Sequence, residues 1–64
     1  MKLWIARDSD GTLWFHENKP EVRDHPTLNL MWWYQDGEQY EIAETFMSQV
    51  TFENSPQQVE IKLI

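Results

Sequence analysis

The side chains able to do acid–base or metal chemistry are few and scattered in this chain of 64 residues. His16 and His25 are its two imidazoles. No H-x-x-x-H pair or comparable spacing sets either beside further ligands, so a zinc site is not predicted. The absence of cysteine excludes disulfides, thiolate metal sites and cysteine nucleophiles. The sequence therefore predicts neither a metal site nor a cofactor.

The run from Asp8 to Gly11 combines carboxylates with a glycine, as a calcium loop does. It lacks the further ligands and the later bidentate glutamate that such a loop requires. Turn chemistry explains the same residues, because Asp at the first position and Gly at the fourth suit a type I turn closed by a glycine bulge. No serine has a nucleophile signature, and so small a sheet leaves little room for a cleft between catalytic carboxylates. We expect no enzymatic activity.

Aromatic and acidic side chains are the better candidates for function, because tryptophan is enriched at the energetic centres of protein interfaces. Trp4 and Trp14 either form an anchor for a partner or belong to the core. In the second case they are covered by residues 18–29 or by Phe46-Met47. A third use is to stack on a sugar or a base, which makes a small ligand-binding domain the alternative function. The candidate binding residues are Trp4, Trp14, His16, Trp32, Trp33, Glu38 and Glu41.

The net charge of the chain indicates which classes of partner it can bind. The net charge is −6, and residues 24–61 contain no Lys or Arg. Direct nucleic-acid binding needs a cationic surface, so it is not expected. An acidic surface favours solubility or docking on a basic protein, and self-association is another way to cover the aromatic side chains. No apolar run is long enough to span a membrane, and the lack of cysteine favours a reducing, cytoplasmic location.

The elements that must position these residues are mainly β-strands. Residues 2–7 and 12–17 are predicted to form a hairpin around the loop 9–11, with Ala6 opposite Trp14 and Ile5 opposite Phe15. Leu3, Ile5, Leu13 and Phe15 then share one face, and Trp4, Trp14 and His16 share the other. Residues 58–64 alternate apolar and polar side chains, which predicts a strand that pairs with residues 3–5.

A second hairpin is predicted around Asp36-Gly37, because this dipeptide tolerates the positive φ angles of tight turns. A two-residue loop would pair Trp33 with Tyr40, whereas a three-residue loop would pair Trp32 with Tyr40. We prefer the two-residue loop. Residues 18–29 contain Pro20 and Pro26 and are predicted to be a loop.

Residues 43–49 are predicted to form a short helical turn with Phe46 or Met47 in the core, followed by a brief extended piece at 50–52. The whole is one domain, 1–64, of mainly β class (α+β at most). Its core is a twisted antiparallel sheet of about five strands. A chain of this length buries only about 60% of its unfolded surface.

Four segments resemble a group of short uncharacterised proteins from bacterial genomes, their phages and other mobile elements. These segments are residues 2–8 (KLWIARD), 10–13 (DGTL), 19–20 (KP) and 50–56 (VTFENSP), with Val59-Glu60. The resemblance implies a mobile-element accessory protein and transfers no catalytic residues. Taken with the acidic and aromatic residues, it leads us to expect a small protein-interaction module.

Overall fold

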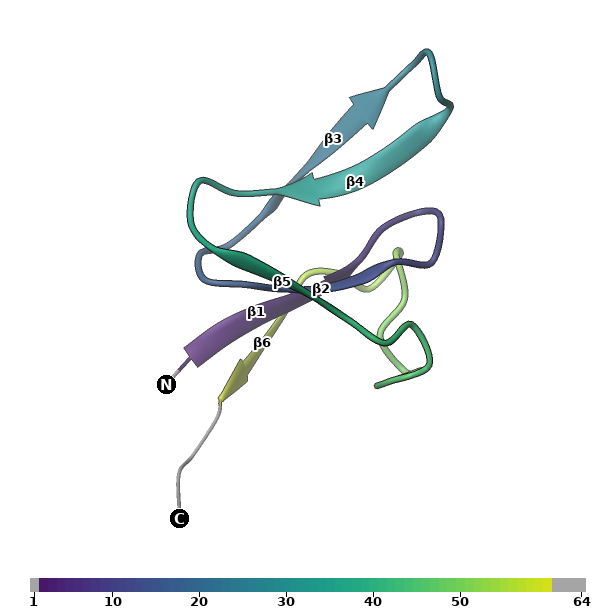
Figure 1. The fold of residues 1–64 in the computed structure, drawn as a ribbon. Coiled ribbons are helices and arrows are strands. Elements are labelled where there is room, and N and C mark those ends of the chain that lie inside the picture. The colour runs from purple at the N-terminus through teal and green to yellow at the C-terminus, as the bar shows by residue number, and fades with distance from the viewer. Residues whose placement is uncertain (1, 61–64) are drawn as a thin grey trace.

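The computed structural model describes residues 2–60, which form six β-strands and no helix. They are arranged in two antiparallel sheets, so the fold is mainly β, as predicted, although the strands number six and not five. The four-stranded sheet has the order β5-β2-β1-β6, and β3 and β4 form a separate two-stranded sheet (Figure 1). The strands are β1 (Lys2–Arg7), β2 (Leu13–His16), β3 (Glu21–His25), β4 (Leu30–Tyr34), β5 (Gln39–Ile42) and β6 (Gln57–Glu60).

The first hairpin is confirmed, including its register. Ile5 lies opposite Phe15 and Ala6 lies opposite Trp14. The Gly11 N–H donates to the Asp8 carbonyl over 3.0 Å, and Gly11 has a φ of 96°, which is the glycine bulge that the sequence favours. The Asp10 carboxylate accepts a hydrogen bond from the Thr12 N–H at 2.9 Å, which fixes the turn further.

The pairing of the two ends of the chain is also confirmed for the residues that the structure describes. β6 runs antiparallel to β1, with Leu3 opposite Val59 and Ile5 opposite Gln57. Residues 61–64 of the predicted strand lie outside the described residues.

The second hairpin, around Asp36-Gly37, is wrong. β4 pairs with β3, and β5 pairs with β2, so Trp33 lies opposite Val22 and Tyr40 opposite Phe15. The Gln35 side chain occupies the would-be turn, where its Oε1 accepts from the Gly37 N–H and its Nε2 donates to the Gly37 carbonyl. Asp36-Gly37 therefore connects the two sheets rather than closing one of them.

The loop predicted for residues 18–29 is wrong in its middle part, which forms β3. This strand fits between Pro20 and Pro26, so neither proline interrupts its ladder. The hairpin turn of residues 26–29 follows, with the Leu28 N–H bonded to the His25 carbonyl and Asn29 in the left-handed region at a φ of 51°. The polar composition of β3 hides it from sequence reasoning, because most of its side chains are exposed on both faces.

The helical turn predicted for residues 43–49 is not formed, and residues 50–52 do not form a strand. The segment is a series of turns, with Met47 in the left-handed region at a φ of 49°. Four carbonyl groups of this segment accept hydrogen bonds from the Arg7 guanidinium. They belong to Glu44, Phe46, Met47 and Val50. These carbonyls are thus turned toward a side chain from β1 and do not build an α-helical ladder.

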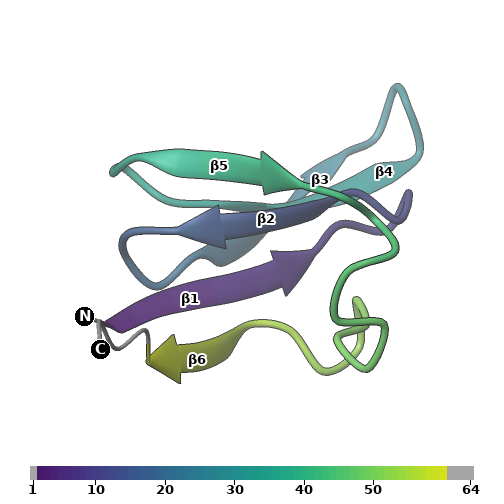
Figure 2. The same cartoon turned by 60° about the horizontal axis from the view of Figure 1, so that its bottom comes forward.

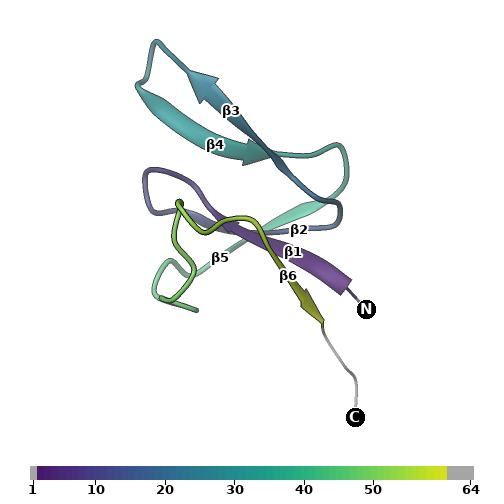
Figure 3. The same ribbon diagram turned by 180° about the vertical axis from the view of Figure 1, so that it is seen from behind.

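Each face of the four-stranded sheet has its own cover. On one face Ile5, Leu13 and Val50 form the buried cluster, with Phe15, Ile42, Met47 and Val59 packed against it. Of the two residues expected to enter the core, Met47 does so and Phe46 stays 52% exposed. Figures 2 and 3 show the β3–β4 hairpin as a second layer over the other face, where Ala6 and His16 are completely buried.

Candidate functional site

Asp8 joins the two sheets. Its Oδ2 accepts from the Trp14 indole N–H at 3.1 Å, and its Oδ1 accepts from the Trp33 backbone N–H at 2.9 Å. Burial raises the pKa of this carboxyl, and the hydrogen bond from Trp33 opposes that rise. Ser9 extends the junction, because its N–H donates to the Met31 carbonyl and its Oγ accepts from the Met31 N–H. The turn of the first hairpin therefore occupies the outer edge of β4.

His16 is completely buried, and neither of its ring nitrogens has a hydrogen-bond partner. Burial lowers its pKa, since the charged imidazolium would lose its hydration. The sequence predicts His16 beside Trp4 and Trp14 at a binding surface. It shares their face of the sheet but lies beneath the hairpin, so its ring is unavailable to a partner in this structure.

The predicted tryptophans are half-buried and separate into two groups. Trp4, Trp14 and Trp33 lie at or near the junction between the sheets. The Trp33 indole donates to the Arg7 carbonyl at 3.1 Å, and Lys19 Nζ lies 5.5 Å from the centroid of the Trp4 ring. Trp32 lies apart on the β3–β4 hairpin, 5.7 Å from the His25 ring. The structure thus does not gather the aromatic candidates into one patch.

The outer edge of β5 is open. The Glu17 N–H donates to the Glu38 carbonyl, so by antiparallel alternation Phe15 and Tyr40 form the next hydrogen-bonded pair. The N–H and C=O groups of Gln39 and Glu41 consequently point away from β2. Among the described strands, none lies on that side of β5.

The side chains along this edge are polar and acidic around one aromatic ring. Glu38 and Glu41 are exposed, and Tyr40 is 55% exposed. Glu17, which directly follows β2 and donates its N–H to the Glu38 carbonyl, is exposed as well. The two acidic residues that the sequence offered as binding candidates therefore flank an unpaired strand edge. Sequence reasoning missed Tyr40 there, because the supposed hairpin placed it opposite Trp33.

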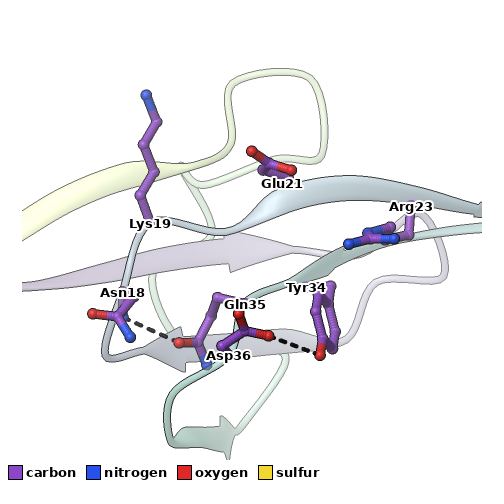
Figure 4. A pocket seen from close by; sticks show the side chains of 7 residues that line it. All are labelled: Asn18, Lys19, Glu21, Arg23, Tyr34, Gln35 and Asp36. Atoms are coloured by element: carbon purple, nitrogen blue, oxygen red, sulfur yellow. Dashed lines mark hydrogen bonds between the residues drawn. The ribbon is translucent and has the colours of Figure 1, made fainter.

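A second feature is a hollow of about 370 Å³ on the β3–β4 hairpin, lined by Asn18, Lys19, Glu21, Arg23, Tyr34, Gln35 and Asp36. Figure 4 shows Asp36 and Tyr34 close together in it, joined by a hydrogen bond of 3.0 Å from the phenol to the carboxylate. The Arg23 guanidinium lies 4.9 Å from the centroid of the Tyr34 ring. None of these residues is a candidate from the sequence, which predicts a loop for residues 18–29 and places Tyr34, Gln35 and Asp36 in the strand and turn of the second hairpin.

The described part of the chain contains no group of three or more His, Asp or Glu residues able to hold a metal ion. No helix long and apolar enough to cross a membrane is found within residues 2–60.

The fold and these two features define a small, two-sheet antiparallel β-protein. A scan against protein-family models, a search of curated proteins and a search of solved structures each found no match to the chain.

Proposed function

We propose that this chain is a protein-interaction module whose β5 edge takes up an extended, basic segment of a partner protein. The observation that carries the proposal is the open edge itself, where the backbone groups of Gln39 and Glu41 point away from the sheet. An extended peptide can add to such an edge as a further strand, with its affinity coming from main-chain hydrogen bonds.

The acidic residues at this edge favour a basic partner segment. Glu38 and Glu41 flank the edge, and the sequence has no Lys or Arg between residues 24 and 61 to neutralise them. Arg7, whose guanidinium contacts the segment that follows β5, is engaged with backbone carbonyls. A segment bearing Lys or Arg is therefore attracted, while a second copy of the chain would bring like charges to the same edge.

We infer binding without catalysis. The two groups whose pKa is shifted by burial, Asp8 and His16, both lie at or beneath the junction of the sheets, and neither lines the hollow on the hairpin. The resemblance of residues 2–13 and 50–60 to proteins of mobile elements supports an accessory or inhibitor role in that setting.

The test uses a fluorescein-labelled peptide of alternating Lys and Val, with a Glu-Val peptide as its charge-reversed control. Gln39→Pro removes an outward N–H from the β5 edge and leaves the β2–β5 ladder intact. Gln58→Pro is the matched control, since antiparallel alternation places the Gln58 N–H on the outer side of β6. Fluorescence anisotropy should show that Gln39→Pro weakens binding about tenfold or more, whereas Gln58→Pro does not.

The double variant Glu38→Gln/Glu41→Gln should weaken binding of the Lys-Val peptide and reduce its dependence on salt. Binding of the Glu-Val peptide with equal affinity, or equal effects of the two proline variants, would reject the edge as the docking site. Circular dichroism of each variant shows whether the fold is retained. Sedimentation equilibrium should give the monomer mass, and a dimer abolished by Gln39→Pro would assign the edge to self-association.

A further inference from the structure

The β3–β4 hairpin carries a site that is separate from the β5 edge. Antiparallel pairing places Glu21 opposite Tyr34, Arg23 opposite Trp32 and His25 opposite Leu30, so these side chains share one face of the hairpin. A hollow of about 370 Å³ lies at one end of this hairpin, and a second of about 220 Å³ is lined by Arg23, Trp32 and Tyr34. Arg23 and Tyr34 line both, so the two hollows are neighbours, and we call them together the hairpin trough.

The walls of the hairpin trough are held in place by the protein's own contacts. Gln35 is 7% exposed and bonds to the backbone of Asn18, Gly37 and Glu38. A Cβ on Gly37 would lie 2.6 Å from Asn18 Nδ2, so glycine permits this close approach. The Tyr34 ring is held by Arg23 on its face and by Asp36 at its hydroxyl. Such preorganisation reduces the entropy lost when a ligand binds.

The charged groups of the hairpin trough have both signs. Arg23 contributes a cation, and Glu21 and Asp36 contribute two carboxylates, whereas the ammonium of Lys19, the other basic residue of the lining, lies 5.5 Å from the centroid of the Trp4 ring. A phosphate or nucleotide would meet both carboxylates as well as a chain of net charge −6, so an anionic ligand is disfavoured. The lining therefore suits a neutral ligand.

The polar groups suit a ligand with many hydroxyls. The Asn18 amide and the Arg23 guanidinium can donate hydrogen bonds to a ligand, and Glu21 and the second oxygen of Asp36 can accept them. The half-exposed Trp32 and Tyr34 rings add apolar surface beside these groups (Figure 4 shows the Tyr34 end). An aromatic surface with a few fixed polar groups is the usual composition of a small-molecule site, and about 370 Å³ lies within the usual range of its volume.

We propose that the hairpin trough binds a neutral carbohydrate, with its C–H face against Trp32 and its hydroxyls toward Asp36, Asn18 and Arg23. This inference is independent of the proposed docking edge, because the trough lies on β3 and β4 and the edge lies on β5.

The experiment is a titration of the ¹⁵N-labelled chain with a panel of neutral oligosaccharides, and with inorganic phosphate and adenosine monophosphate as anionic probes. Trp32→Ala should lower the affinity for the best oligosaccharide about tenfold or more, and Trp32→Tyr should retain most of it. Tyr40→Ala and Gln39→Pro are the controls outside the trough and should leave the affinity unchanged. Asp36→Asn should weaken binding while the amide spectrum keeps its native dispersion.

Chemical-shift changes should cluster at Asn18, Arg23, Trp32, Tyr34 and Asp36. Tighter binding of phosphate or of adenosine monophosphate than of any neutral sugar would overturn the proposal, as would the absence of carbohydrate binding at millimolar concentration across the panel. Carbohydrate binding that Tyr40→Ala weakens as much as Trp32→Ala would place the site elsewhere and would also overturn it. Failure of the Lys-Val peptide to bind would affect the docking edge alone.

Discussion

Replacing Arg7 by alanine should remove much of the stability of this protein, because one guanidinium holds the segment of residues 43–50 against the sheet. Arg7 Nε donates to the Val50 carbonyl at 2.6 Å, and Nη1 donates to the carbonyls of Gly11 at 2.8 Å and Glu44 at 2.9 Å. Nη2 makes two longer bonds, to Phe46 at 3.3 Å and to Met47 at 3.4 Å. The planar fork of arginine thus uses all its N–H groups at once.

The size of the effect follows from the partly buried bonds. A hydrogen bond to a charged group contributes about 1.5–3 kcal/mol, and the exposed bond to Glu44 contributes less because water can replace it. Counting only the bonds to Val50 and Gly11, at the lower end of that range, Arg7→Ala costs about 3 kcal/mol. A domain of this size is stable by roughly 3–10 kcal/mol, so the variant loses between a third and all of its stability.

Urea unfolding followed by tryptophan fluorescence measures this loss. Arg7→Lys keeps the charge but presents a single ammonium, so it should recover only about 1 kcal/mol of the loss. Arg23→Ala is the matched control, since it changes the net charge equally and removes one exposed contact with the Tyr34 ring worth about 0.5–1 kcal/mol. If Arg7→Ala is no more destabilising than Arg23→Ala, the guanidinium does not hold the segment and the reasoning is refuted.

Three further predictions concern the junction and the connection between the sheets. His16 has a lowered pKa in the folded state, so the unfolded chain binds the proton more readily, and stability should fall as the pH drops below about 6.5. The urea midpoint should show this fall for the native chain, and His16→Leu should abolish it; an unchanged slope would contradict a buried neutral imidazole. Asp8→Ala leaves the N–H groups of Trp14 and Trp33 without an acceptor and should cost about 2–4 kcal/mol, with a smaller loss in Asp8→Asn, and equal losses would argue against the hydrogen bonds. Gly37→Ala should cost about 1–3 kcal/mol in the same assay, because the added Cβ would lie 2.7 Å from Oε1 of the buried, hydrogen-bonded Gln35; an unchanged stability would contradict this close contact.

The sequence by itself determined the parts of the fold that depend on local chemistry. The Asp8-to-Gly11 turn set both the loop length and the register of the first hairpin, because only glycine adopts the bulge conformation freely and the apolar pairs then match. The alternation around Val59 likewise identified the C-terminal strand, in which Val59 lies opposite Leu3 of β1. Of the seven binding candidates that the sequence offers, Glu38 and Glu41 are the two that lie at the open edge of β5.

Only the tertiary structure decided which strands pair across longer distances. Asp36-Gly37 is compatible with a tight turn, but β4 has a better partner in β3, and Gln35 bonds to the backbone where the turn would form. Residues 21–25 carry no apolar alternation, so their strand exists because β4 supplies its ladder. The open edge of β5 and the hairpin trough both follow from this exchange of partners. A local sequence pattern indicates that a segment can form a strand. The strand with which it pairs depends on the burial and hydrogen bonding of the whole chain.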